Sequence, residues 1–207
     1  MAAKPKQILV AIAMLLGAAV VAGLAATGSF DGGAGTSGVP DPQPTPARAS
    51  GPAAPGNTAM FAFLARQTSN SCGLEPGALE RMPGRMRLQG SCCFPMNLAA
   101  HQSQVQGLRA YSSVRQIPAD PYDVPVSVAK RLLGYDATIH LTKLQARRYA
   151  QAMHMSSLKG PCCCRCWRWY AFRGLSKYLL SDGGWTAARL ATLVDLLEGC
   201  GGPAGRD

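Results

Sequence analysis

Apolar side chains recur at helical spacing through most of the chain after Asn57, and no stretch alternates apolar and polar positions over the length of a strand. Asn97, Thr142 and Thr186 stand where helix caps are expected, because their side-chain oxygens accept hydrogen bonds from the first turn of a helix. The helix after Thr142 is expected to continue to Met155. The pattern therefore predicts three capped helices.

Two further helices follow from the same spacing. One is a short helix over residues 126–133 that ends near Gly134. The other begins near Pro161, because the N–H that proline lacks would have no partner in the first turn of a helix, and it ends at 181–184. Residues 57–96 predict short helical pieces. Loops are expected there at Pro76, Pro83 and Pro95. The predicted fold class is all-α, a small bundle of about five helices cross-linked by cysteines.

An uninterrupted run of apolar and small residues extends from Ile8 to about Gly28, directly after Lys4 and Lys6. About 20 apolar residues are enough to span a bilayer as a helix, and positive charge before the run keeps the N-terminus in the cytoplasm. Small residues at 22–29 also fit a cleaved signal peptide. Both readings predict that the rest of the chain lies outside the cytoplasm, as a single-pass membrane protein or as a secreted or periplasmic protein.

The chain is predicted to have three parts. Residues 1–28 are a transmembrane anchor or signal peptide, residues 29–56 a disordered Pro/Gly-rich linker, and residues 57–207 an extracytoplasmic cysteine-rich helical domain. The formal net charge is +10, but the basic residues are scattered and form no long face with aromatics. This favours a solvated basic surface over nucleic-acid binding. The membrane, contacted through the N-terminal helix, is the partner that the sequence indicates; a protein or metal partner is left unidentified.

Eight cysteines are the most distinctive feature of the chain. They are Cys72, Cys92, Cys93, Cys162, Cys163, Cys164, Cys166 and Cys200. Outside the cytoplasm the default state of such residues is the disulfide, but cysteines adjacent in sequence have α carbons about 3.8 Å apart, too close for ordinary disulfide geometry. Cys163–Cys166 and Cys162–Cys166 are allowed if the segment is helical, and otherwise the four clustered cysteines pair outward. Cys72 and Cys200 are the candidates for structural disulfides that tie both ends of the domain to its centre.

The first functional reading is therefore a disulfide-stabilised binding or structural module. An alternative uses the same sulfur atoms as ligands, because thiolates and thioethers select soft metal ions. The candidate metal ligands are Cys92, Cys93, Cys162, Cys163, Cys164, Cys166, His154 and Met155. If the 92–93 and 162–166 groups face each other, four or more sulfurs converge. The cofactor would then be a soft ion of the Cu(I), Hg or Zn kind.

A second alternative is a thiol–disulfide oxidoreductase that uses Cys163 and Cys166 as catalytic residues. They form a Cys-x-x-Cys sequence just after Pro161. At a helix N-terminus the macrodipole favours the thiolate over the thiol. However, no βαβ pattern precedes the motif, so a thioredoxin fold is not predicted.

Other catalytic chemistry is poorly represented. The chain contains no G-x-S-x-G, H-E-x-x-H, P-loop or G-x-G-x-x-G sequence. A catalytic Cys–His pair, made of Cys92 or Cys93 with His101 or His154, is an alternative that the sequence does not decide, because such partners meet only in the fold. The sequence leans towards a non-enzymatic role.

Overall fold

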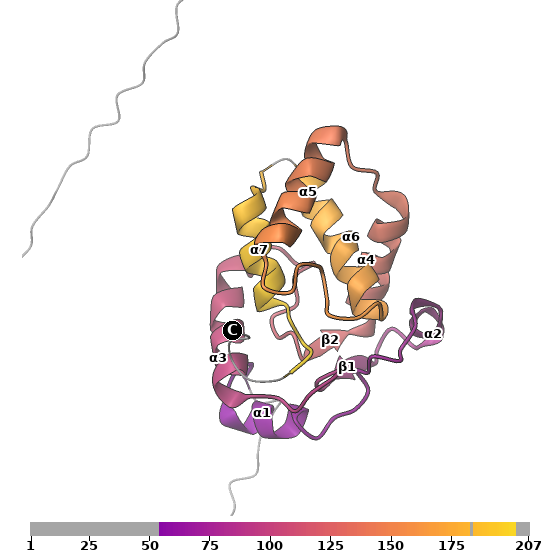
Figure 1. The fold of residues 1–207 in the computed structure, drawn as a ribbon. Helices are drawn as coiled ribbons and strands as arrows, with labels where there is room; N and C mark the ends of the chain where they lie inside the picture. Colours follow the sequence, from indigo (N-terminus) through magenta and orange to yellow (C-terminus); the bar gives the residue numbers. More distant parts are fainter. Residues whose placement is uncertain (1–53, 183, 202–207) are drawn as a thin grey trace, which may run out of the picture. The chain divides into compact units, whose positions relative to one another are not determined.

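Helices form most of the part of the chain that the structure, a computed structural model, describes: residues 54–182 and 184–201 (Figure 1). No helix within these residues is both long and apolar enough to cross a bilayer. The predicted anchor or signal peptide, and all but the last three residues of the predicted linker, lie outside the described residues. Membrane attachment and location therefore stay predictions from the sequence.

The described residues contain seven α-helices, one 3₁₀ turn and two short strands. Their order is α1 (Thr58–Leu64), α2 (Pro76–Arg81), β1 (Arg87–Gln89), α3 (Leu98–Leu108), η1 (Arg109–Tyr111), β2 (Asp123–Pro125), α4 (Val126–Thr138), α5 (Lys143–Met155), α6 (Trp167–Ser181) and α7 (Ala187–Leu196). The prediction of a mostly helical, cysteine-rich fold is confirmed. The strands are an addition that the sequence pattern did not predict.

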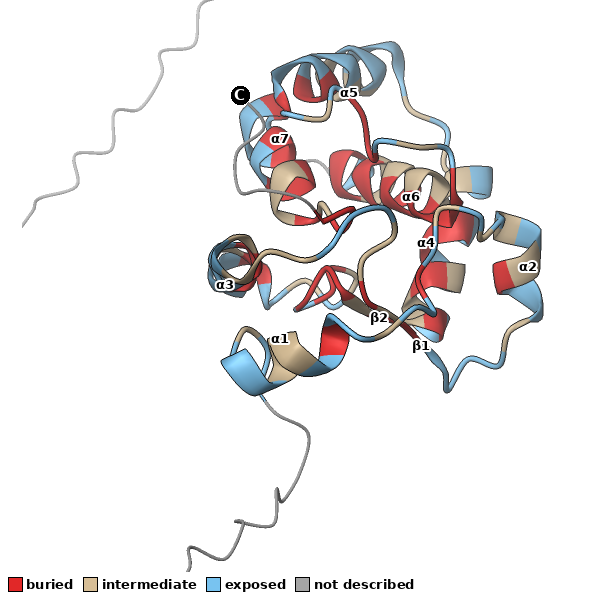
Figure 2. Cartoon of the chain, turned by 60° about the horizontal axis from the view of Figure 1, so that its bottom comes forward, coloured by how far each residue is buried: buried red, intermediate tan, exposed pale blue. Residues whose placement is uncertain are grey.

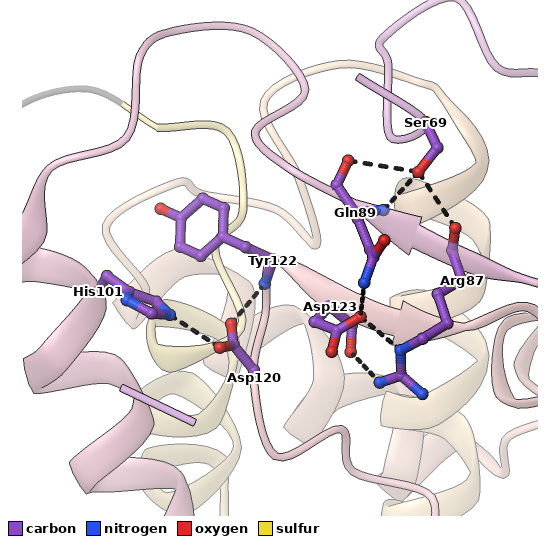
Figure 3. Close-up of polar contacts among 7 residues, drawn as sticks. All are labelled: Ser69, Arg87, Gln89, His101, Asp120, Tyr122 and Asp123. Atoms are coloured by element: carbon purple, nitrogen blue, oxygen red, sulfur yellow. Dashed lines mark hydrogen bonds and ion pairs between the residues drawn. The ribbon is translucent and has the colours of Figure 1, made fainter. Parts of the chain in front are cut away.

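The two strands pair antiparallel, with Leu88 opposite Val124. Both of these side chains are fully buried. Asp123 joins the strands on the other face by accepting hydrogen bonds from Arg87 (2.5 Å) and Gln89 (3.0 Å), as Figure 3 shows. Strands of three residues carry too little alternation to be recognised in a sequence, which explains why this ribbon was missed.

Three of the predicted helix starts are confirmed. The side chains of Asn97, Thr142 and Thr186 each accept a hydrogen bond from a backbone N–H in the first turn of α3, α5 and α7. At α5 the cap is reciprocal, because the side chain of Gln145 also accepts from the backbone N–H of Thr142. The helix after Thr142 ends at Met155 as predicted.

Three other boundaries differ from the prediction. Helix α4 continues through Gly134 to Thr138, and Pro76 begins α2 instead of lying in a loop. Helix α6 begins at Trp167 and not near Pro161. Residues 161–166 form bends instead, because this segment turns its cysteines towards three other parts of the chain.

Helix α6 is the central element of the described fold. Figure 2 shows that it is buried along much of its length, whereas α5 is exposed on its outer face. It packs closely on α4 at Gly174, where an added Cβ would lie 2.7 Å from the backbone nitrogen of Asp136. Asp136 accepts two hydrogen bonds of 2.6 Å from Arg173, and the rings of Tyr135 and Tyr178 stack at 4.8 Å. These contacts fix the middle and C-terminal half of α6 against α4, and the cysteines gather at its other end.

Candidate functional site

Three loop segments run side by side in front of the N-terminus of α6. The backbone N–H of Cys72 donates to the carbonyl of Cys92 (3.3 Å), and that of Cys92 donates to the carbonyl of Gly199 (3.1 Å). The N–H groups of Cys93 and Phe94 both donate to the carbonyl of Cys200. Segments that are up to about 130 residues apart in sequence are thus held together by backbone hydrogen bonds that do not depend on sulfur chemistry.

A buried amide ties these loops to α6. The indole N–H of Trp167 donates to the side-chain oxygen of Asn70 (3.0 Å), and the Asn70 amide donates to the carbonyl of Gly90 (2.8 Å). The backbone N–H of Trp167 also donates to the carbonyl of Leu74 (3.0 Å). Asn70 and Trp167 are both buried. The loop that carries Cys92 is therefore connected to the first residue of α6 through Asn70.

All eight cysteines of the chain lie in one connected group, called the sulfur cluster here. Cys72 and Cys93 form a disulfide. Distances between the other Sγ atoms are 3.5 Å for Cys92–Cys93, 3.7 Å for Cys93–Cys163, 3.6 Å for Cys162–Cys200, 3.0 Å for Cys163–Cys200 and 3.5 Å for Cys72–Cys164. Cys162 is also within hydrogen-bonding reach of Cys92 and Cys166. The two groups that the sequence analysis singled out are therefore brought together, and both outlying cysteines join them.

The sulfur cluster has a buried side and a surface side. The buried group consists of Cys92, Cys162, Cys166 and Cys200, of which the last three are at most 3% exposed. The rim group consists of Cys72, Cys93, Cys163 and Cys164, of which Cys93 and Cys163 are exposed. Reagents and ions can therefore reach one end of the cluster from solvent, while the other end is shielded.

Within the buried group the proton distribution is uneven. Hydrogen bonds from the thiols of Cys166, Cys200 and Cys92, in that order of importance, lower the pKa of Cys162. The pKa of each of those three thiols is raised, primarily by its hydrogen bond to Cys162. Hydrogen bonds from the three neighbouring thiols favour a negative charge on this one sulfur. Cys162 is therefore the cysteine of the buried group whose thiolate form its surroundings favour.

A charged residue lies inside the protein next to this group. Arg168 is 0% exposed, and its guanidinium donates to the carbonyl oxygens of Pro121 (2.9 Å) and Leu197 (2.8 Å). It also lies over the rings of Trp167 (5.3 Å) and Phe172 (4.8 Å). Helix α6 supplies Arg168 on the turn that follows Cys166. In the sequence Arg168 stands two residues after the Cys-x-x-Cys motif and adds positive charge near it, but nothing there indicates that it is buried.

No carboxylate among residues 54–182 and 184–201 forms an ion pair with Arg168. Guanidinium groups stay charged in proteins, and a buried charge is costly unless an opposite charge compensates it. The charge of Arg168 favours the thiolate forms of Cys92 and Cys162. The buried sulfur group thus lies where the charge of Arg168 favours its ionised form.

Two glycines allow the last loop to approach this closely. A Cβ on Gly199 would lie 2.5 Å from the guanidinium carbon of Arg168. Gly201 has a φ of +76°, and a Cβ there would meet Ser91 and the backbone of Phe94. The loop that delivers Cys200 therefore requires glycine on both sides of the cysteine.

The Cys-x-x-Cys sequence is split between the two sides of the cluster. Cys163 is exposed, near Cys93 and Cys200, whereas Cys166 is buried beside Cys162. Burial and a hydrogen bond to Cys200 raise the pKa of Cys163, and the pKa of Cys166 is raised as well. The lowered pKa expected at these two positions belongs to Cys162 instead.

The other candidate ligands lie apart from the sulfur atoms. His154 and Met155 are on the exposed face of α5, and Met155 is 49% exposed. Among the described residues neither makes a hydrogen bond to a cysteine. The structure places both in the last turn of α5 and not at the sulfur cluster.

The histidine considered as a catalytic partner has another role in the fold. His101 is fully buried, and its Nε2 lies 2.8 Å from Oδ2 of Asp120 (Figure 3). Its ring packs against Phe61 and edge-on to Tyr122. Asp120 also accepts from the backbone N–H of Tyr122 (2.9 Å). The pair fixes the turn before β2 and makes no contact with sulfur in the described structure.

Comparison of the chain with protein-family models, curated proteins and solved structures gave no match in any of the three. The chemistry of the sulfur cluster is therefore the feature of the chain that indicates a function.

Proposed function

We propose that the domain binds soft, thiophilic metal ions, Cu(I) foremost, through the buried group of Cys92, Cys162, Cys166 and Cys200. The observation that carries this proposal is the placement of three cysteine thiols around the sulfur of Cys162, beside a buried arginine that lacks a carboxylate partner among the described residues. Location outside the cytoplasm remains part of the proposal on the strength of the N-terminal sequence alone.

The donor set supports a soft ion. Every ligand atom is sulfur, and thiolates select Cu(I) over harder ions. Sulfurs that share one metal ion at bond lengths of about 2.3 Å are separated by roughly 3.8–4.0 Å. The 3.6 Å between Cys162 and Cys200 is close to that spacing, so this pair requires only a small outward shift to share an ion. Cys162, with three sulfur neighbours, is placed to bridge ions if more than one is bound.

Charge supports a thiolate centre over disulfides. Metal binding removes protons from thiols, so a Cu(I) ion held by two or more thiolates has a net negative charge. Arg168 supplies a positive charge inside the protein at that point. A disulfide is neutral and would leave this charge uncompensated.

The rim provides a route to the buried group. Cys163 is exposed, and its Sγ lies 3.0 Å from that of the buried Cys200. An ion captured at Cys163 can pass to Cys200 by exchange of one thiolate ligand for the next. No opening of the helical core is needed for such a transfer.

The test is a competition titration of the full chain with Cu(I) against a chromophoric Cu(I) chelator, without oxygen and with ascorbate to keep copper reduced. The native protein should withdraw copper from the chelator, and Cys162→Ser should weaken binding at least about tenfold, which is what the loss of roughly 1.4 kcal/mol produces. Met155→Ala is the matched control and should bind as the native chain does. Equal copper affinity in native protein and Cys162→Ser would contradict the proposal.

A second candidate function has its own supporting observation. Cys72–Cys93 is already a disulfide, and Cys163 and Cys200 are close enough to form another after a small movement. A fully oxidised cluster would make the domain a disulfide-stapled module for binding or structure, as an oxidising compartment would favour. Thiol titration of unreduced, denatured protein separates the two: the stapled module has no free thiol, and the metal site requires the thiols of the buried group.

A further inference from the structure

We propose that the rim group forms a second soft-metal site that the Cys72–Cys93 disulfide closes, so that reduction of this bond increases the number of Cu(I) ions bound. This inference rests on the proposed function, since both sites take the same class of ion. Its basis is that the Sγ atoms of Cys72, Cys93 and Cys164 all lie within 4.8 Å of one another. Three thiolates at such spacing are a complete ligand set for Cu(I).

Each sulfur of the disulfide has a free cysteine beside it. Cys164 Sγ lies 3.5 Å from Cys72 Sγ, and Cys163 Sγ lies 3.7 Å from Cys93 Sγ. Cleavage of the disulfide would therefore create two thiols next to two that are already present. The rim would then offer four thiols instead of two.

The backbone around the disulfide is held independently of it. The N–H of Cys72 donates to the carbonyl of Cys92, and the N–H of Cys93 donates to the carbonyl of Cys200, both at 3.3 Å. The same loops are also held by the buried Asn70, which accepts a hydrogen bond from Trp167 and donates one to the carbonyl of Gly90. After reduction the two thiols are thus expected to stay close together, which lowers the entropic cost of gathering the ligands.

Exposure makes the rim the part of the cluster that responds to redox conditions. Cys93 is exposed and Cys72 is half-buried, whereas Cys162, Cys166 and Cys200 are at most 3% exposed. A thiolate reagent can therefore attack the Cys72–Cys93 bond from solvent without entering the core. The buried site would keep its ion while the rim site opens and closes.

An external dithiol is the reductant in this reaction. One dithiol sulfur attacks the Cys72–Cys93 bond to form a mixed disulfide and release one cysteine; its second sulfur then displaces the other cysteine. The dithiol leaves as its own disulfide, having supplied two electrons and two protons. Cu(I) then displaces the protons of the Cys72, Cys93 and Cys164 thiols to water and binds their sulfur atoms.

The experiment measures Cu(I) per chain for the full-length protein before and after treatment with dithiothreitol, which is removed without oxygen before copper is added. Mass spectrometry checks that the disulfide is present in the first sample and absent in the second. Reduction should raise the capacity by at least one Cu(I) per chain. Reduced Cys164→Ser should lose this gain and keep the tightest copper site, and reduced Cys162→Ser should keep the gain.

Unchanged capacity after complete reduction, with tight copper binding in both states, would overturn the rim site and leave the buried site standing. A gain that persists in Cys164→Ser would also overturn it, because the added ion would then be held elsewhere. Absence of copper binding in both states would instead refute the proposed function.

Discussion

Substitution of Gly199 by alanine tests how closely the last loop is packed on the buried arginine. The added Cβ would lie 2.5 Å from Cζ of Arg168 and 2.8 Å from its Nη1. A methyl group needs well over 3 Å, so either the guanidinium or the loop must move by roughly 1 Å. An exposed arginine would move at little cost. Arg168 is fully buried and held by the carbonyls of Pro121 and Leu197, so its guanidinium cannot move without losing these hydrogen bonds.

The cost follows from these two hydrogen bonds. A shift of that size lengthens bonds of 2.8 and 2.9 Å beyond hydrogen-bonding range. Each hydrogen bond to a charged group contributes about 1.5–3 kcal/mol, and overpacking costs about 1–3 kcal/mol. Since the loop can relax in part, Gly199→Ala is expected to lower the free energy of unfolding by about 3 kcal/mol.

Urea unfolding followed by tryptophan fluorescence measures this change. With a urea dependence of about 1.5–3 kcal/mol per molar, the midpoint should fall by about 1–2 M. Gly134→Ala is the matched control, because a Cβ there meets nothing within 4 Å outside its own helix. That substitution lies within α4 and should raise stability by about 0.5–1 kcal/mol. If Gly199→Ala unfolds at the same urea concentration as the native chain, the packing of the last loop on Arg168 is wrong.

Three more outcomes are expected. Burial raises the pKa of Asp136, but hydrogen bonds and charge from Arg173 and Lys177 outweigh this effect and hold the pKa below its usual value. The ion pairs therefore stabilise the fold above about pH 4 and are lost as the pH falls below it. Asp136→Asn should accordingly flatten the decline in the free energy of unfolding in urea between about pH 5 and 3. Asn70→Ala leaves the indole N–H of Trp167 without its acceptor and should cost about 2–3 kcal/mol in the same assay; a loss below about 0.5 kcal/mol would contradict the role of the amide. Because the pKa of Cys162 is lowered, metal-free protein with its buried thiols reduced should show thiolate ultraviolet absorbance at neutral pH, which Cys162→Ser removes and Cys164→Ser retains.

The parts of the fold that could be predicted are those written in local sequence. The caps at Asn97, Thr142 and Thr186 each depend on one side chain and the three residues after it, and all three are confirmed. The start of α6 could not be read in this way. Pro161 is an acceptable first residue of a helix, but the sulfur contacts of residues 162–166 keep this segment bent, and the helix begins only at Trp167.

The same distinction between local sequence and distant contacts applies to the site. Residue type alone identified the cysteines, but their arrangement depends on contacts between distant segments, such as those of Cys72 with Cys164 and of Cys163 with Cys200. Arg168 is recognisable as positive charge near the Cys-x-x-Cys motif, but sequence does not distinguish a buried arginine from a surface one. His154 and Met155 stand near the cysteines in sequence, yet the direction of α5 carries them to an exposed face.

X-ray absorption at the copper edge, on the full chain loaded with one equivalent of Cu(I), probes the buried sulfur group most directly. A first shell made of sulfur alone is expected, unchanged in Met155→Ala and His154→Ala and altered or lost in Cys162→Ser. Nitrogen or oxygen ligands in that shell, or a spectrum that Cys162→Ser leaves as it is, would show that copper does not bind at these cysteines.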